Sequence, residues 1–275
     1  MVFGATNLPI PKFDRPPVYE TVLGVQFDPL NGFSVPHYGL YWGIIRGDYP
    51  NYEVHPPLNP AVEQFASDAW KQAKVGIEVV SVPDVRTWFL NHEGTILLQV
   101  QKDRFLQNWR KMQDSDVYPH YDQLKPKFCR EWQRFCQFLA DVGIERPDVN
   151  QCEVTYVNHI DIDLGPKSYG DLHKVISCWS GQCSGNFLSD PESVNFNSRY
   201  LLPGKQGRLH VSMQPVIRRR DAREILRLNL TVRGKPNSSE LDDIIDWLDL
   251  GHEWVVRGFA DVTTDEMHRI WGRTQ

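Results

Sequence analysis

Glutamate, glutamine, histidine and arginine recur at every second position of several segments whose alternation of apolar and polar residues predicts β-strands. Successive side chains of a strand point to opposite faces, so each polar set lies on one face of its strand. These residue types form directional hydrogen bonds, and arginine also binds carboxylate or phosphate through two parallel N–H groups. We expect a binding surface centred on Glu20, Gln99, Gln101, Glu153, His159, His210 and Arg227.

Two interpretations of these polar faces stay open. In the first, they are the solvated side of antiparallel sheets, which commonly bury one face and expose the other. In the second, two such faces meet in a cleft that fixes a polar or anionic ligand on rigid strands.

The best candidates for acid/base catalysis are Glu153 and His159, which share one face of the same predicted strand. Six positions along a strand separate them by about 20 Å, because the rise is about 3.3 Å per residue. They cannot act as a pair, so we assign no catalytic residue. His159 or His210 acting singly on a ribose hydroxyl would make the protein a metal-independent RNA-binding or RNA-processing enzyme, which is the alternative function.

Opposite charges are segregated in the last part of the chain. Residues 199–235 hold ten basic and two acidic residues, a local net charge of +8, whereas residues 236–275 hold nine acidic and three basic ones, a net charge of −6. Arg218, Arg219 and Arg220 form the tip of a predicted hairpin and either bind RNA or DNA or neutralise the acidic helix that follows. That helix, predicted within residues 239–254, is also a candidate surface for a protein partner.

The composition is typical of a folded globular protein. The chain has 275 residues, a net charge of −5, 41% hydrophobic residues and nine tryptophans. No apolar run is long enough to span a membrane and residues 1–17 lack the pattern of a secretory signal, so we expect a cytoplasmic protein. Nucleotide-binding, hydrolase and zinc-protease motifs are absent. Cys178 and Cys183 lack the further ligands of a structural zinc site, so we expect neither a metal nor a cofactor.

The order of the predicted elements indicates an α+β protein. Strands are expected at 18–27, 86–91, 95–101, 152–163, 193–201, 208–218 and 224–233, and helices at 38–46, 59–70, 118–142, 169–179, 239–255 and 263–271. Residues 103–111 fit either a strand or a helix. Residues 1–163 thus form a β-α-β-β-α-β half, and residues 164–275 form an α-β-β-β-α half that shares strand 152–163. We expect two similar halves, each an antiparallel sheet covered by helices on one face, in a duplicated ferredoxin-like or helix-grip-like order.

A series of short blocks spans nearly the whole chain. They lie at residues 16–27, 39–42, 45–46, 49–50, 88–89, 97–101, 103–105, 108–110, 152–158 and 263–272. As a set they resemble a sporadically distributed family of uncharacterised prokaryotic proteins. The resemblance implies a bacterial or archaeal protein with patchy inheritance, encoded on mobile-element or antiphage-defence loci. Because it implies no reaction, we expect an intracellular binding or interaction protein with a protein or polyanionic partner.

Overall fold

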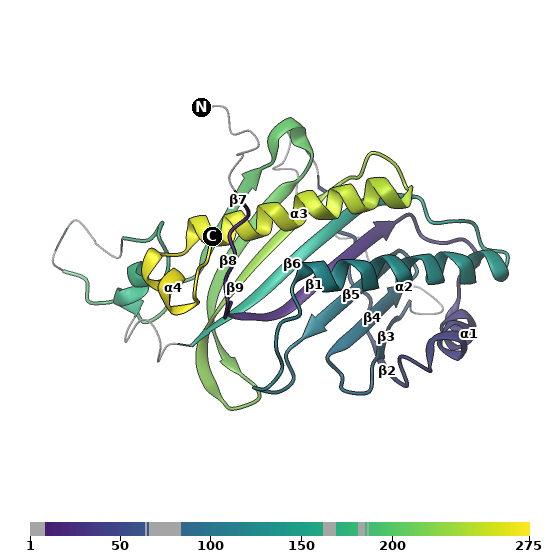
Figure 1. The fold of residues 1–275 in the computed structure, drawn as a ribbon, viewed down its shortest axis with the longest axis horizontal. Helices are drawn as coiled ribbons and strands as arrows, with labels where there is room; N and C mark the ends of the chain where they lie inside the picture. Colours follow the sequence, from purple (N-terminus) through teal and green to yellow (C-terminus); the bar gives the residue numbers. More distant parts are fainter. Residues whose placement is uncertain (1–8, 64, 66–83, 162–168, 181–184, 186) are drawn as a thin grey trace.

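One antiparallel sheet forms the frame of the molecule (Figure 1). The computed structural model describes residues 9–63, 65, 84–161, 169–180, 185 and 187–275. Its strands are β1 (Val18–Phe27), β2 (Asn51–His55), β3 (Arg86–Leu90), β4 (Ile96–Gln101), β5 (Arg104–Arg110), β6 (Val149–Asp161), β7 (Phe196–Leu201), β8 (Arg208–Arg218) and β9 (Arg223–Gly234). They lie side by side in the order β2-β3-β4-β5-β1-β6-β9-β8-β7, and all neighbours run antiparallel.

Helices cover one face of this sheet. The described helices are α1 (Val35–Ile45), α2 (Tyr121–Asp141), α3 (Leu241–Val262) and α4 (Asp265–Ile270), with short 3-10 turns η2 (Tyr169–Lys174) and η3 (Pro203–Lys205). Figure 1 shows α2 and α3 lying along the same side of the sheet, where α2 contacts β5 and α3 contacts β6, β8 and β9. We call the opposite side of the sheet the polar face.

The predicted division into two similar halves, each with its own sheet, is wrong. β1 and β6 pair in the middle of the sheet, with Val22 opposite Thr155 and Val25 opposite Cys152. Two separate sheets would leave β1 and β6 as edges with unpaired N–H and C=O groups, and their pairing satisfies both. β6, the strand expected at the junction, pairs with β1 on one side and with β9 on the other. The described chain is therefore an α+β protein with one nine-stranded sheet.

Most predicted elements are found close to their expected positions. The strands expected at 18–27, 86–91 and 95–101 are confirmed as β1, β3 and β4, and the ambiguous segment 103–111 contains strand β5. The helix expected at 59–70 is wrong where it can be tested, since residues 59–63 are neither helix nor strand and 66–70 lie outside the described residues. β2 was not expected, although Tyr52 and Val54 alternate with polar residues in this short segment; both side chains are exposed on the edge strand.

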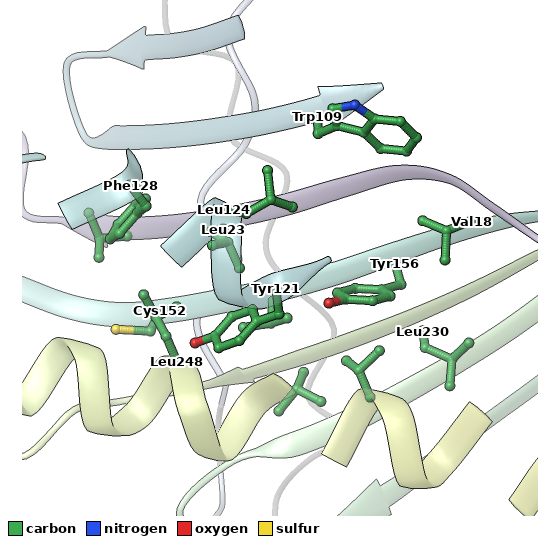
Figure 2. Packing of buried hydrophobic residues seen from close by; sticks show 14 of the residues in the cluster. Val18, Leu23, Trp109, Tyr121, Leu124, Phe128, Cys152, Tyr156, Leu230 and Leu248 are labelled. Carbon is green, nitrogen blue, oxygen red and sulfur yellow. The ribbon is translucent and has the colours of Figure 1, made fainter. Parts of the chain in front are cut away.

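The core lies between the helices and the sheet. Along α2, apolar residues recur at steps of three or four, so one stripe of the helix faces the sheet. Figure 2 shows Leu124 and Phe128 of α2 and Leu248 of α3 among the buried side chains between the two layers. At the same time β1 turns Leu23 and Val25 toward the helices, which leaves its alternate residues on the polar face.

Candidate functional site

All seven predicted binding residues lie on the polar face. On β4 and β6 the buried apolar residues Leu98, Val100, Val154 and Tyr156 face the helices, so their neighbours in sequence face the other way. The same alternation holds on β1, β8 and β9. The seven residues are Glu20 on β1, Gln99 and Gln101 on β4, Glu153 and His159 on β6, His210 on β8 and Arg227 on β9. Because the described strands form one sheet, the second interpretation, a cleft between the faces of two sheets, does not apply.

A segment that follows β2, residues 58–63, crosses the polar face. The amide group of Gln101 accepts a hydrogen bond from the main-chain N–H of Leu58 at 2.8 Å and donates one to its carbonyl oxygen at 2.9 Å. Arg104 of β5 donates to the carbonyl oxygen of Asn59 at 3.1 Å. The segment thus passes over strands that are far from β2 in the sheet. We call residues 58–63 the crossing segment.

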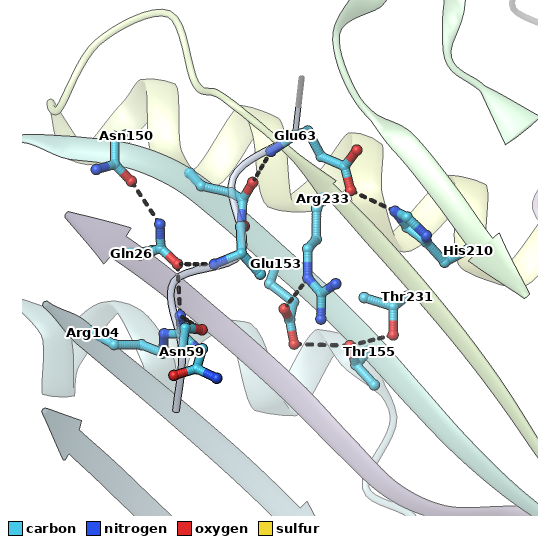
Figure 3. A network of polar contacts seen from close by, with 12 residues as sticks. Gln26, Asn59, Glu63, Arg104, Asn150, Glu153, Thr155, His210, Thr231 and Arg233 are labelled. Carbon is cyan, nitrogen blue, oxygen red and sulfur yellow. Dashed lines mark hydrogen bonds and ion pairs between the residues drawn. The ribbon is translucent and has the colours of Figure 1, made fainter. Parts of the chain in front are cut away.

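The middle of the crossing segment is held by two further glutamines (Figure 3). Gln26 of β1 accepts from the N–H of Ala61 at 3.1 Å, and Gln151 of β6 accepts from the N–H of Glu63 at 2.9 Å. Gln151 also donates to the carbonyl oxygen of Ala61. All these bonds run to main-chain groups, so they hold an extended backbone whatever its side chains are.

The end of the crossing segment is anchored by charge. The Glu63 carboxylate is largely buried and pairs with Arg208 and His210 of β8. The guanidinium of Arg208 also lies 5.2 Å from the ring centroid of Phe65. Burial opposes ionisation of Glu63, but the hydrogen bond and charge of His210 and the charge of Arg208 outweigh it and lower its pKa below the usual value.

Replacing Glu63 with glutamine is expected to lower the free energy of unfolding at pH 7 by about 1–3 kcal/mol, because charged hydrogen bonds are lost. The pKa of Glu63 is lower in the folded state than in the unfolded chain. Its ion pairs therefore stabilise the protein above the unfolded pKa, and this contribution is lost as pH falls through the folded pKa. Urea unfolding of both proteins between pH 7 and pH 3 measures the difference. A difference that does not shrink with acidification, or an equal effect of the exposed change Glu145→Gln, would contradict this anchor.

A second chain of polar groups runs across β3, β4, β5 and β1. Arg86 donates to Gln99 at 2.9 Å, Gln99 donates to Asn108 at 2.8 Å, and Asn108 donates to Glu20 at 2.5 Å. Burial raises the pKa of Glu20, although the bond from Asn108 and the charge of Arg110 act against the shift. Two predicted residues, Glu20 and Gln99, thus share one hydrogen-bonded row.

Glu153 lies in a third group, beside the crossing segment. It pairs with Arg233 of β9 at 2.5 Å and accepts a hydrogen bond from Thr155 at 3.0 Å, and the hydroxyls of Thr155 and Thr231 are 2.8 Å apart (Figure 3). The carboxylate of Glu153 is therefore paired with Arg233 and not with His159. The absence of a Glu153–His159 pair agrees with their spacing of six along β6.

His159 and Arg227 are neighbours on β6 and β9, directly opposite each other in the ladder. The imidazole stacks on Tyr19, with ring centroids 3.8 Å apart. Burial, reinforced by the charges of Arg218 and Arg227, lowers the pKa of His159 to about 4, so the ring is neutral at pH 7. Nδ1 of His159, Nε of Arg227 and Oδ1 of Asn229 are buried and have no hydrogen-bond partner among the described residues. Buried polar atoms of this kind favour a ligand that satisfies them.

Two arginines at the tip of the hairpin between β8 and β9 form ion pairs with carboxylates of this chain. Arg218 pairs with Asp161 at 3.0 Å and with Asp221 at 2.5 Å, and Arg220 pairs with Asp114 at 2.7 Å. The third tip residue, Arg219, is exposed.

The acidic helix α3 has other partners within the described residues. Asp249 pairs with Lys125 of α2 at 2.9 Å, and Glu253 pairs with Arg257 of the same helix at 2.7 Å. The ion pairs of Arg218 and Arg220 given above run to other acids, so the expected neutralisation of α3 by the hairpin tip is not what the described contacts show.

Among residues that the structure describes, no group of three or more His, Cys, Asp or Glu side chains is placed to hold a metal ion. In the same part of the chain no helix is long and apolar enough to cross a membrane. Cys178 is an exposed free thiol, and Cys183, the other half of the C-x4-C spacing, lies outside the described residues.

No family model matches this chain, and no curated protein shows significant similarity to it. The resemblance to a prokaryotic family therefore stays a prediction.

Of the residues that hold the crossing segment, Gln101 and His210 were predicted, whereas Gln151 and Arg104 were not. Gln151 lies two positions before Glu153 and Arg104 two before Leu106, so the alternation of each strand places them on the polar face. Extending the predicted strand 152–163 by one residue includes Gln151, and assigning the ambiguous segment 103–111 to a strand includes Arg104. The crossing segment itself carries no such signal, because residues 58–63 follow neither period 2 nor period 3.6.

Proposed function

We propose that this protein is a binding protein whose polar face receives an extended segment of a protein partner. The observation that carries the proposal is the crossing segment, an extended piece of this chain whose main-chain N–H and C=O groups bond to Gln101, Gln26 and Gln151. Glutamine amides offer a donor and an acceptor side by side, as an extended peptide backbone does. The main chain of a second extended segment on the same face would also lie beside polar side chains that can donate and accept hydrogen bonds.

The polar groups that a partner would use lie farther along the strands. Arg227 and Asn229 are on β9, and Arg227 is six residues from Arg233, about 20 Å at the rise of a strand. Within the part of the chain that the structure describes, the buried Nε of Arg227 and Oδ1 of Asn229 have no hydrogen-bond partner. A carboxylate on the partner would satisfy Arg227, and a main-chain N–H would satisfy Asn229. We therefore propose an acidic, extended peptide as the ligand.

The RNA-processing alternative has less support. Both histidines that it would use already have partners within the chain. His210 pairs with Glu63, and His159 stacks on Tyr19. At the hairpin tip, Arg218 and Arg220 are paired with carboxylates, which reduces the charge offered to a phosphate backbone.

Selection of peptides from a displayed random library against the immobilised full-length protein is expected to enrich acidic sequences. The change Arg227→Ala should weaken an enriched peptide at least about tenfold, since a hydrogen bond to a charged group contributes about 1.5–3 kcal/mol. Arg219→Ala removes the same charge from the exposed hairpin tip and should change the affinity less than about twofold. The dissociation constants are measured by isothermal titration calorimetry on variants with unchanged melting curves.

Two results would refute the proposal. One is a selected peptide whose affinity is unaffected by Arg227→Ala. The other is salt-sensitive binding of RNA that depends on Arg219 in the absence of any enriched peptide, which would transfer the function to the hairpin tip.

A further inference from the structure

A cavity of about 1180 Å³ opens on the helix-covered side of the sheet, away from the polar face. It lies where the first turn of α2, the middle of α3 and residues 10–18 meet. This volume is sufficient for a small organic molecule. About half of the residues that line the cavity are apolar or aromatic. The others are polar or charged, and they include Lys12, Asp122, Lys125, Asn158, His252 and Glu253.

One wall of the cavity is an aromatic, hydrogen-bonded chain. The hydroxyls of Tyr118 and Tyr156 are 2.7 Å apart, and the Tyr156 hydroxyl is 3.0 Å from Nδ1 of His252. Tyr121 stacks on His252 with centroids 4.0 Å apart and ring planes within 4°. Figure 2 shows Tyr121 and Tyr156 close together between α3 and the sheet. Residues 118, 156 and 252 come from three separate parts of the chain, which are brought together only by folding.

The imidazole and phenol groups of this wall are uncharged at neutral pH. Burial lowers the pKa of His252 to about 4 and outweighs the nearby carboxylates of Asp122 and Asp249, which act in the opposite direction. The pKa of Tyr118 is raised, mainly by burial and further by the negative charge of Asp122. The rings of Tyr118, Tyr156 and His252 are therefore uncharged, and the negative charge of Asp122 acts on all three.

Asp122 differs from the other carboxylates of helices α2 and α3 that line the cavity. Asp249 is paired with Lys125, and Glu253 is paired with Arg257. Asp122, at the second position of α2, makes no ion pair with any residue in the described part of the chain. It thus supplies a negative charge beside neutral aromatic rings.

The same wall already holds one ammonium group. Nζ of Lys125 lies 2.9 Å from a carboxylate oxygen of Asp249 and 5.6 Å from the ring centroid of Tyr121. A carboxylate together with an aromatic face is a general way to bind a cationic nitrogen. Asp122, Tyr118 and Tyr156 likewise combine a carboxylate with aromatic rings, and all three line the cavity.

We propose that this cavity binds a small organic cation, an amine or a quaternary ammonium compound, with its charge between the Asp122 carboxylate and the rings of Tyr118 and Tyr156. The apolar part of the ligand lies against the Phe13 and Phe259 side of the cavity. This site is independent of the polar face, so either proposal can fail alone.

The probe is benzyltrimethylammonium, titrated into the full-length protein and followed by calorimetry, with benzyl alcohol and benzoate as neutral and anionic analogues. The cation is expected to bind at least tenfold more tightly than either analogue. Asp122→Asn should weaken the cation at least tenfold, and Asp122→Glu should restore most of the affinity. Asp242→Asn is the matched control, because Asp242 occupies the same second position of α3 and does not line the cavity. It should leave the affinity within twofold.

Three outcomes would overturn the proposal. These are tighter binding of benzoate than of the cation, an unchanged affinity in Asp122→Asn, and the absence of cation binding at millimolar concentration. Melting curves establish that each variant is folded, and loss of binding in Asp122→Asn counts only together with recovery in Asp122→Glu.

Discussion

Replacing Phe135 with alanine is expected to lower the free energy of unfolding by about 3–5 kcal/mol, the usual cost of removing a fully buried phenyl ring. Phe135 of α2 is 0% exposed. Its ring lies 5.3 Å from that of Tyr41 on α1 and 5.2 Å from that of Phe105 on β5. The ring thus joins two helices to the sheet, and its loss leaves a cavity with walls from three elements. Chemical denaturation monitored by tryptophan fluorescence measures the change.

The matched control for Phe135 is the same substitution at Phe187, whose side chain is 97% exposed. Because no buried surface is lost there, Phe187→Ala should change the free energy of unfolding by less than about 0.5 kcal/mol. Similar effects at the two positions would mean that α2 does not pack on the sheet as described.

Replacing Gly234 with valine is expected to destabilise the protein by about 3 kcal/mol, at the upper end of the usual cost of overpacking. A Cβ atom on Gly234, at the end of β9, would overlap the carbonyl oxygen of Gln206 and lie 2.7 Å from Cα of Gly207. Both neighbours are main chain, so a side-chain rotation cannot relieve the overlap. Moving Gln206 would also break the 3.1 Å hydrogen bond that its carbonyl oxygen accepts from Trp247.

Gly47→Ala is the comparison for Gly234, since an added Cβ at Gly47 has no atom within 4 Å and the residue does not need a positive φ. We expect a change of less than about 1 kcal/mol there, because Gly to Ala at an unstrained position mainly affects the unfolded chain. Differential scanning calorimetry measures the melting temperatures of both variants. Equal melting temperatures would show that β8 and β9 do not approach each other at Gly207.

The two proposed sites lie on opposite sides of one sheet and rest on different kinds of evidence. On the polar face, the crossing segment supplies a bound example of the proposed ligand class, an extended peptide. On the helix side, the Lys125 ammonium against Asp249 and Tyr121 plays the same part for an organic cation. In both sites, the chain's own contacts suggest the chemistry of the ligand.

The amino-acid sequence by itself determined which residues share a face. Alternation with period 2 is a local property, so Glu153 and His159 had to lie on the same side of β6 whatever surrounds that strand. The apolar stripe of α2 likewise follows from residues three or four apart. For this reason all seven predicted residues lie on the polar face, although the arrangement of the sheet was predicted wrongly.

Only the tertiary structure decided which of these faces are neighbours. The β1–β6 ladder, the bonds from Gln101 and Gln151 to the crossing segment, and the approach of Tyr118 to Tyr156 join residues that are distant in sequence. Such contacts form because buried main-chain and polar groups must find partners, and many pairings satisfy the same local pattern. Local periodicity selects a face for each residue, whereas long-range packing selects the partner.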